Sequence, residues 1–185
     1  PQGYETRGGI TYTLLGELAG MRLVHTISEM GHGAVGAAQQ RTRDAIDHWS
    51  PVAVVAVGVA FGMDETKQKI GDVLVATHVQ DYELGRLDED GSLTPRGQRA
   101  PSSDPWTNRL RHTDTARRNT ESDWPKVRFG VLLSGQKLVD NLDYRDTLRN
   151  NFGETVGGEM EAQGVYVSAH AAKIEGIKIS LLDAG

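Results

Sequence analysis

The sequence predicts an α/β domain, a three-layer sandwich in which helices cover a mixed, mostly parallel central sheet. Apolar runs of strand length alternate with helical segments, and Gly-rich turns separate them. Residues 52–57 (VAVVAV) form a continuous apolar run, which is typical of a central strand covered on both faces. The chain has 185 residues, the size of one ordinary domain. We therefore expect residues 1–185 to form a single domain.

Two strands and a Gly-rich turn open the chain. Residues 10–18 and 22–27 are rich in β-forming side chains. Residues 30–33 (MGHG) form the turn, and residues 34–49 follow as a helix with apolar and charged side chains on different sides. We expect Ser50-Pro51 to end this helix.

The remainder continues the alternation. The strand at 52–57 ends in a second Gly-rich turn, residues 58–62 (GVAFG). Residues 88–125 are polar and contain four prolines, which indicates a surface loop that includes one helix. Further core strands are expected at 70–76, 129–133 and 177–182, and helices at 106–118, 138–150 and 159–172.

Composition excludes several functions. The formal net charge is -5 and no long block of Lys or Arg stands against it, so a nucleic-acid-binding surface is not expected. The absence of cysteine excludes disulfides, thiolate nucleophiles and Cys-ligated metal. No apolar stretch approaches the roughly 18 residues that cross a bilayer. We expect a cytoplasmic protein without metal or cofactor. The chain begins at Pro1 without methionine, which indicates a fragment, a processed product or an unseen start.

The two Gly-rich turns are candidate ligand sites. Each follows an apolar strand, so its backbone amides belong to the carboxyl edge of the sheet, where open α/β folds bind ligands. Glycine permits close approach of the backbone to an anion or a sugar. A plain tight turn is the commoner explanation of either segment, and neither matches a Walker or dinucleotide pattern.

Glu159-Met160-Glu161 is a more specific pattern. Two carboxylates flank a flexible apolar side chain directly after Gly157-Gly158. A carboxylate accepts two hydrogen bonds in one plane, which matches the 2′- and 3′-hydroxyls of a ribose, and Met160 can pack on the sugar. Acidic residues also suit a helix N-terminus, and the spacing fits both explanations equally.

Asp183 is a candidate general acid. It follows the apolar strand 177–182, so it belongs to the carboxyl edge of the sheet. A carboxylic acid there can protonate N7 of a purine and make the base a better leaving group. A turn or helix N-cap aspartate is the commoner role of such a residue.

Several segments, in order, resemble the nucleoside phosphorylase/nucleosidase superfamily. They are residues 54–63 (VVAVGVAFGM), 70–76 (IGDVLVA), 132–141 (LLSGQKLVDN) and 157–164 (GGEMEAQG). The sequence is most similar to the branch of methylthioadenosine/S-adenosylhomocysteine nucleosidases, including versions fused to bacterial and fungal immune receptors. Together with the helix at 34–49, these segments cover most of the chain.

The resemblance implies a substrate site for a purine nucleoside or nucleotide. Its implied residues are Glu159, Met160, Glu161, Val59, Ala60, Gly62, Leu138 and Val139. Glu161 falls on the ribose-binding glutamate and Met160 on the sugar-packing methionine. Leu138 falls on the wall that holds the base, where nucleosidases usually place an aromatic ring. Leu138 cannot stack as a ring does, so the resemblance implies altered base affinity or base choice.

The two ends of the chain depart from the family. By the resemblance, the family begins with a strand whose end carries a water-activating glutamate or part of a phosphate site. We expect residues 1–185 to lack this first strand and the C-terminal helix of the family. Asp183 lies 22 positions after Glu161, about one residue short of the usual spacing. Gly31, His32 and Gly33 are candidate phosphate-binding residues, although a solvent-exposed turn explains His32 equally.

The resemblance therefore implies cleavage of an N-glycosidic bond. Asp183 loosens the base, Glu161 holds the ribose, and water or phosphate captures the sugar, with water favoured because the nearest relatives are nucleosidases. We also expect a homo-oligomer and a defence effector domain. The rival hypothesis is a degenerate nucleoside-binding, signalling or assembly module without catalysis, which the abbreviated ends favour.

Overall fold

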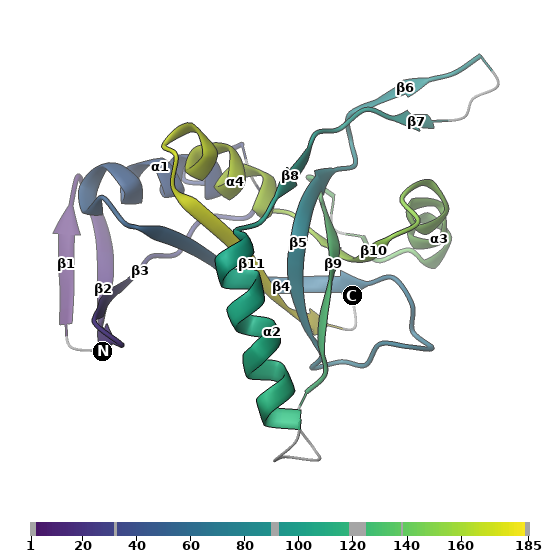
Figure 1. Cartoon of the computed structure of the whole chain (residues 1–185). Helices are drawn as coiled ribbons and strands as arrows, with labels where there is room; N and C mark the ends of the chain where they lie inside the picture. Colours follow the sequence, from purple (N-terminus) through teal and green to yellow (C-terminus); the bar gives the residue numbers. More distant parts are fainter. Residues whose placement is uncertain (1–2, 32, 90–92, 119–124, 138, 184–185) are drawn as a thin grey trace.

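The computed structural model describes residues 3–31, 33–89, 93–118, 125–137 and 139–183 (Figure 1). The strands are β1 (Gly3–Arg7), β2 (Ile10–Leu18), β3 (Met21–His25), β4 (Ala53–Gly62), β5 (Val73–Asp81), β6 (Gly85–Leu87), β7 (Leu93–Pro95), β8 (Arg99–Pro101), β9 (Val127–Ser134), β10 (Thr155–Glu159) and β11 (Glu175–Asp183). The helices are α1 (Ala38–Trp49), α2 (Asp104–Arg118), α3 (Leu142–Asn151) and α4 (Ala162–Ala171). None of the helices in these ranges is long and apolar enough to cross a membrane.

The main sheet is mixed, as predicted. Its strand order is β11-β4-β10-β9-β5-β8, and β11 also pairs with β5, so five of the strands close into a ring. The β11–β4, β10–β9 and β5–β9 pairs are parallel, whereas β10–β4, β11–β5 and β5–β8 are antiparallel. The parallel β11–β4 and β5–β9 ladders run along almost the whole of their strands, whereas each antiparallel ladder pairs only two or three residues, so the predicted mixed, mostly parallel sheet is confirmed. The Gly157-Gly158 pair lets β10 approach β4 closely in the antiparallel sense, since a Cβ on Gly157 would lie 2.6 Å from the Phe61 carbonyl oxygen.

A second sheet, antiparallel β1-β2-β3, packs against α1 at the other side of the molecule (Figure 1). Tyr12 in β2 is fully buried, and its hydroxyl lies 2.9 Å from Nδ1 of His48 at the end of α1. The Arg7 guanidinium stacks 3.7 Å from the Trp49 ring. These contacts fix the small sheet to the helix that follows it in sequence.

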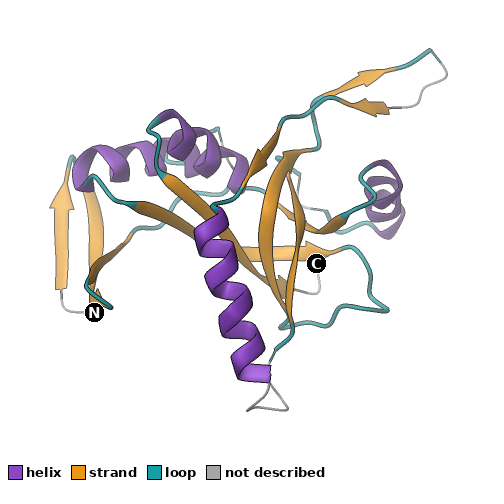
Figure 2. Cartoon of the chain, viewed as in Figure 1, coloured by secondary structure: helices purple, strands orange, loops and turns teal. Residues whose placement is uncertain are grey.

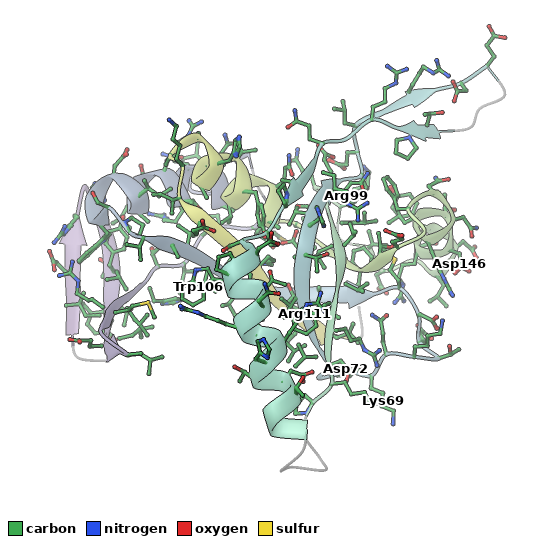
Figure 3. The ribbon with its side chains drawn as sticks, viewed as in Figure 1. Lys69, Asp72, Arg99, Trp106, Arg111 and Asp146 are labelled. Carbon is green, nitrogen blue, oxygen red and sulfur yellow. The ribbon has the colours of Figure 1, made fainter. Side chains whose placement is uncertain are left out.

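Helices lie on different sides of the main sheet, as the predicted sandwich requires. Figure 2 shows α1 and α4 together above the sheet, while α2 crosses in front of it. Arg111 of α2, labelled in Figure 3, lies 4.2 Å from the Phe129 ring of β9. On the α4 side, one core cluster consists of Ala60, Leu74, Ala76, Val79, Leu132, Ala162, Tyr166 and Leu182. A second cluster, which includes α3, consists of Phe61, Met63, Tyr82, Leu133, Val139, Leu148 and Phe152.

All four predicted helices are confirmed with shifted starts, and α4 begins at Ala162 rather than at residue 159. Helix α1 begins at Ala38 rather than at residue 34, because a backbone hydrogen bond from Glu29 to Gly36 holds the preceding residues in a loop. It ends at Trp49, where Ser50 adopts a left-handed conformation. Asn141 caps α3 by accepting a hydrogen bond from the Tyr144 backbone, so α3 starts later than residue 138. Helix α2 includes two residues before Trp106.

The segment at 58–62 is not a turn. It continues β4, because β11 pairs with β4 as far as Phe61 and β10 pairs with Phe61 and Gly62. The expectation that this strand is covered on both faces is also wrong: Val55, Val57 and Val59 are 46%, 73% and 56% exposed. The alternating pleat puts these valines on one face, whereas Gly58 and Ala60 face α4.

The predicted loop at 88–125 has more structure than expected. Strands β6 and β7 form a hairpin that projects from the body of the molecule (Figure 1), and β8 joins the edge of the main sheet at β5. These strands are three residues long, which is too short for a recognisable alternating pattern.

Candidate functional site

The turn between β10 and α4 holds the two glutamates that the sequence singled out. The Glu159 carboxylate accepts backbone hydrogen bonds from Glu161 at 2.9 Å and from Ala162 at 2.9 and 3.1 Å. Glu159 therefore satisfies the N-terminal amides of α4. Glu161 occupies the N-cap position but makes no capping hydrogen bond. Helix capping thus explains Glu159 and leaves the Glu161 carboxylate for another purpose.

Glu161 faces a hollow of about 560 Å³. One of its carboxylate oxygens accepts the Gly31 backbone N–H at 3.0 Å, which joins the Gly-rich loop to a residue 130 positions later. The hollow is large enough for a small ligand. Its wall consists of residues 24–30, side chains of α1, residues 53–58, Glu161, Val165 and Lys178.

Lys178 is a cation in this wall that sequence reasoning missed. Its side chain is 2% exposed, and Nζ lies 3.2 Å from a Glu159 carboxylate oxygen. Gly58 of the neighbouring strand makes room for it, since a Cβ there would lie 2.9 Å from Nζ. The available signal was a single lysine within the apolar strand GIKISLL, where burial demands a charged partner.

Two strand edges border the same hollow. Within the described residues, β3 pairs only with β2, and residues 53–60 of β4 pair only with β11. Residues 24–25 of β3 and 53–58 of β4 both line the hollow. The hollow is therefore bounded by backbone groups as well as by the side chains of Glu161 and Lys178.

A comparison of the sequence with models of protein families shows to which family the chain belongs. The family model described as Phosphorylase superfamily matches residues 2–185. The chain belongs to the phosphorylase superfamily. Its resemblance to this superfamily, inferred from residues 54–63, 132–141 and 157–164, is thereby confirmed.

Two relatives with similar sequences are named as nucleosidases. It is 25% identical over 159 residues to a death domain-containing ATP nucleosidase of Amphimedon queenslandica, which covers 77% of this chain and 30% of that protein. It is 27% identical over 172 residues to a 5′-methylthioadenosine/S-adenosylhomocysteine nucleosidase of Tolumonas auensis, covering 90% and 70%. The chain thus spans between about a third and two thirds of the length of these relatives.

Solved structures show the same fold. The nucleosidase of Neisseria meningitidis in complex with methylthio-immucillin-A has a TM-score of 0.77 at 23% identity, covering 97% of this chain and 75% of that one. A futalosine hydrolase mutant of Helicobacter pylori has a TM-score of 0.77 at 18% identity, covering 98% and 79%.

The structure brings some of the predicted site residues together and separates others. Glu161 and Gly31 meet at the hollow, whereas Gly33 lies in the adjoining loop with open space around it. Val59 points to the exposed face of β4. Ala60, Gly62 and Val139 are buried, Met160 is half-buried, and none of the four lines the hollow. The predictions for His32 and Leu138 lie outside the described residues.

Asp183 lies at the end of β11, as expected, but on the other face of the strand. Lys178, Ser180 and Leu182 are buried on the α4 face, so alternation turns Asp183 to the face of Leu181. Backbone hydrogen bonds from Leu182 to Asp72 and from Gly71 to Leu182 fix this register. Asp72, labelled in Figure 3 below β5, also accepts a hydrogen bond from Arg128 at 2.7 Å. The structure therefore does not bring Asp183 beside Glu161, and its role stays a prediction.

Two buried phenols remain protonated at neutral pH. Burial raises the pKa of Tyr166, which lies on α4 and hydrogen-bonds Ser102, to about 12. Burial also raises the pKa of Tyr82 to about 12. Neither phenol is a proton acceptor near pH 7.

Proposed function

We propose that this domain binds a purine ribonucleoside or nucleotide in the hollow beside Glu161 and cleaves its N-glycosidic bond with water. The observation that carries the proposal is that the two glutamates have different roles: Glu159 caps helix α4, and Glu161 faces the hollow. Glu159 accepts the backbone N–H groups at the start of α4, so the Glu161 carboxylate is not needed as a helix cap. A hydrogen bond from the Gly31 backbone N–H holds the Glu161 carboxylate at the hollow, where it can accept hydrogen bonds from a ribose diol. The nucleosidase names of the relatives support the reaction class.

In this mechanism Glu161 stabilises the ribose as it gains oxocarbenium character. Lys178 keeps Glu159, and through it the backbone of Glu161, in a fixed position. Positioning and electrostatic stabilisation of the transition state supply most of the rate. Asp183 protonates the base in the proposal, and this requires the end of β11 to turn its carboxylate toward the α4 face.

The domain is proposed to need further segments of a longer protein. Among the residues that the structure describes, no strand pairs with the edges of β3 and β4 at the hollow, which supports an additional strand there. The exposed face of Val57, Val59 and Leu181 supports a covering helix. The greater length of the solved relatives supports both. We also propose a homo-oligomer, in which this face would be covered by a second copy if no helix of the same chain covers it. Similarity to a death domain-containing ATP nucleosidase supports a defence effector, and a cytoplasmic location stays a proposal without support of its own.

The second candidate function is nucleoside binding without catalysis. The position of Asp183 on the face opposite Lys178 favours it, because a general acid must reach the bond that it helps to break. The hollow beside Glu161 serves both candidates.

Release of free base distinguishes the two candidates. Inosine, adenosine, methylthioadenosine and ATP would be incubated with the full-length protein, with and without phosphate, and products separated by chromatography. We expect release without phosphate, loss of turnover in Asp183→Asn with binding retained, and weakened binding in Glu161→Gln. Glu154→Gln, at a carboxylate that is 84% exposed, is the matched control. No release from any substrate would contradict catalysis, and phosphate-dependent release would replace water by phosphate.

A further inference from the structure

Gln68 is a buried amide in the loop that joins β4 to β5. It is 9% exposed, and both ends of its side chain form hydrogen bonds. Its Oε1 accepts the backbone N–H groups of Met63 and Asp64, each at 2.8 Å. Its Nε2 donates to the backbone carbonyl oxygen of Val156 at 2.6 Å. A single side chain thereby joins the end of β4 to a residue of β10 that lies 88 positions after Gln68.

The Gln68 amide extends the antiparallel pairing between β4 and β10. This pairing comprises two residue pairs, the outer of which joins Gly62 to Gly157. The same register puts Met63 opposite Val156, and here the Gln68 amide takes the place of the direct backbone hydrogen bond. Gly62 leaves room for the amide, because a Cβ on Gly62 would lie 2.8 Å from Gln68 Oε1.

The pairing of β4 with β10 determines where Glu159 lies relative to Lys178. Glu159 ends β10, whereas Lys178 belongs to β11, and both strands are neighbours of β4. The ion pair between the two side chains therefore spans β4. Glu159 in turn accepts the backbone N–H of Glu161, whose carboxylate faces the hollow. A change in the separation of β10 from β4 consequently moves Glu161.

We propose that Gln68 is a positioning residue for the candidate site: its amide holds β10 against β4, so that the Glu161 carboxylate faces the hollow. This inference rests on the proposed function. An amide suits this place because its oxygen accepts two N–H groups and its nitrogen donates to a carbonyl oxygen. A carboxylate of the same size accepts both N–H groups but has no hydrogen for the Val156 carbonyl oxygen. A methionine side chain offers no N–H or O–H donor and only a weak acceptor.

The test measures the preference for adenosine over 2′,3′-dideoxyadenosine by titration calorimetry on the full-length protein, on Gln68→Glu and on Gln68→Met. A protonated glutamate donates its O–H to the Val156 carbonyl oxygen, whereas an ionised glutamate cannot. We therefore expect Gln68→Glu to lose roughly tenfold of the preference at about pH 9, the effect of one lost hydrogen bond to a charged group, and to regain it at about pH 5. Gln68→Met should lose the preference at both pH values and serves if Gln68→Glu does not fold at the higher pH.

Gln40→Glu is the matched control. Gln40 is exposed, and its Oε1 accepts the Gly36 backbone N–H at 3.0 Å, a hydrogen bond that a carboxylate keeps. Three charged side chains form ion pairs at the end of β4 that Gln68 contacts: Asp64, Lys67 and Arg149. They are the same in every variant, so a pH effect confined to Gln68→Glu belongs to the new carboxyl group.

Protection of the Ala162 backbone N–H against hydrogen exchange is a second readout, and it needs no ligand. Glu159 accepts this N–H, so a displaced β10 exposes it. We expect lower protection of Ala162 in Gln68→Met than in the unsubstituted protein, with the protection of β5 unchanged.

An unchanged preference for adenosine in both Gln68 variants overturns the inference, whatever their melting temperatures. An equal loss in Gln40→Glu, or a loss in Gln68→Glu that persists at about pH 5, overturns it as well. Failure of the proposed function is distinguishable, because the unsubstituted protein then shows no preference for adenosine while the protection of Ala162 still falls in Gln68→Met. Unchanged protection in that case overturns the positioning role too.

Discussion

The buried ion pair between Glu159 and Lys178 predicts a large loss of stability when one partner is removed. Both side chains are almost fully excluded from water, with exposures of 1% and 2%, and Nζ lies 3.2 Å from the carboxylate. Breaking such a pair leaves an uncompensated buried charge, which costs roughly 3–5 kcal/mol. For a domain whose total stability is about 5–15 kcal/mol, Glu159→Gln or Lys178→Met removes a large part of it.

Chemical denaturation followed by tryptophan fluorescence measures the loss of unfolding free energy, and thermal denaturation measures the change in melting temperature. The melting temperature of a domain of this size falls by about 2–4 °C per kcal/mol, so a decrease of roughly 6–20 °C is expected for each single variant. The double variant Glu159→Gln/Lys178→Met should lose less than the sum of the two, because neither charge remains alone. The exposed pair Arg99–Glu154 is the control, and Glu154→Gln should cost less than about 1 kcal/mol.

The result that refutes this reasoning is a loss below about 1 kcal/mol for both single variants, or strict additivity in the double variant. The reasoning also requires a functional effect. Glu159 accepts the Glu161 backbone N–H, so Glu159→Gln should weaken ribonucleoside binding as well as stability.

Two further predictions concern pH and the lysine position. Burial raises the pKa of Tyr82 and Tyr166 from 10.0 to about 12, so the folded state holds these protons more tightly than the unfolded state. Their contribution to stability is therefore complete below about pH 10 and is lost as the pH rises toward 12. The melting temperatures of Tyr82→Phe and Tyr166→Phe should fall less steeply than that of the unsubstituted protein between pH 10 and pH 12. An equal dependence of the melting temperature on pH in all three proteins would contradict the raised pKa values. Gly58→Ala places a Cβ 2.9 Å from Lys178 Nζ and should displace the ammonium from Glu159, which weakens nucleoside binding and lowers the melting temperature as well. Gly176→Ala on the same strand as Lys178, where the added Cβ meets only ordinary contact at 3.5 Å, should leave binding unchanged, and equal effects of both substitutions on titrated affinity would contradict the role of Lys178.

Sequence patterns predicted the long elements of the fold well. The strands at 10–18 and 129–133 and the helices α1 and α2 have strong local patterns, and the structure confirms them. Patterns failed where backbone pairing over long distances decides the conformation. Residues 58–62 contain two glycines, which favour a turn locally, but pairing with β10 and β11 keeps them extended.

The sequence predicted which acidic residues belong to the candidate site, but not which of them caps the helix and which faces the hollow. The spacing identified Glu159 and Glu161 but could not say which one caps the helix, because that depends on the angle at which β10 enters α4. The sequence could not predict on which face of β11 the Asp183 side chain lies either, because a shift of one residue in the strand register moves a side chain to the opposite face. Sequence analysis did not identify Lys178 as a site residue, because its ion-pair partner Glu159 lies 19 residues earlier in another strand.

The most direct test of the central claim, that Glu161 binds the ribose diol, is the affinity for adenosine compared with 2′,3′-dideoxyadenosine. Titration calorimetry on the unsubstituted protein and on Glu161→Gln gives four dissociation constants. We predict that the unsubstituted protein prefers adenosine by roughly 10- to 150-fold, the equivalent of about 1.5–3 kcal/mol for charged hydrogen bonds, and that Glu161→Gln removes this preference while dideoxyadenosine binding hardly changes. Equal affinity of the unsubstituted protein for both ligands would contradict the claim.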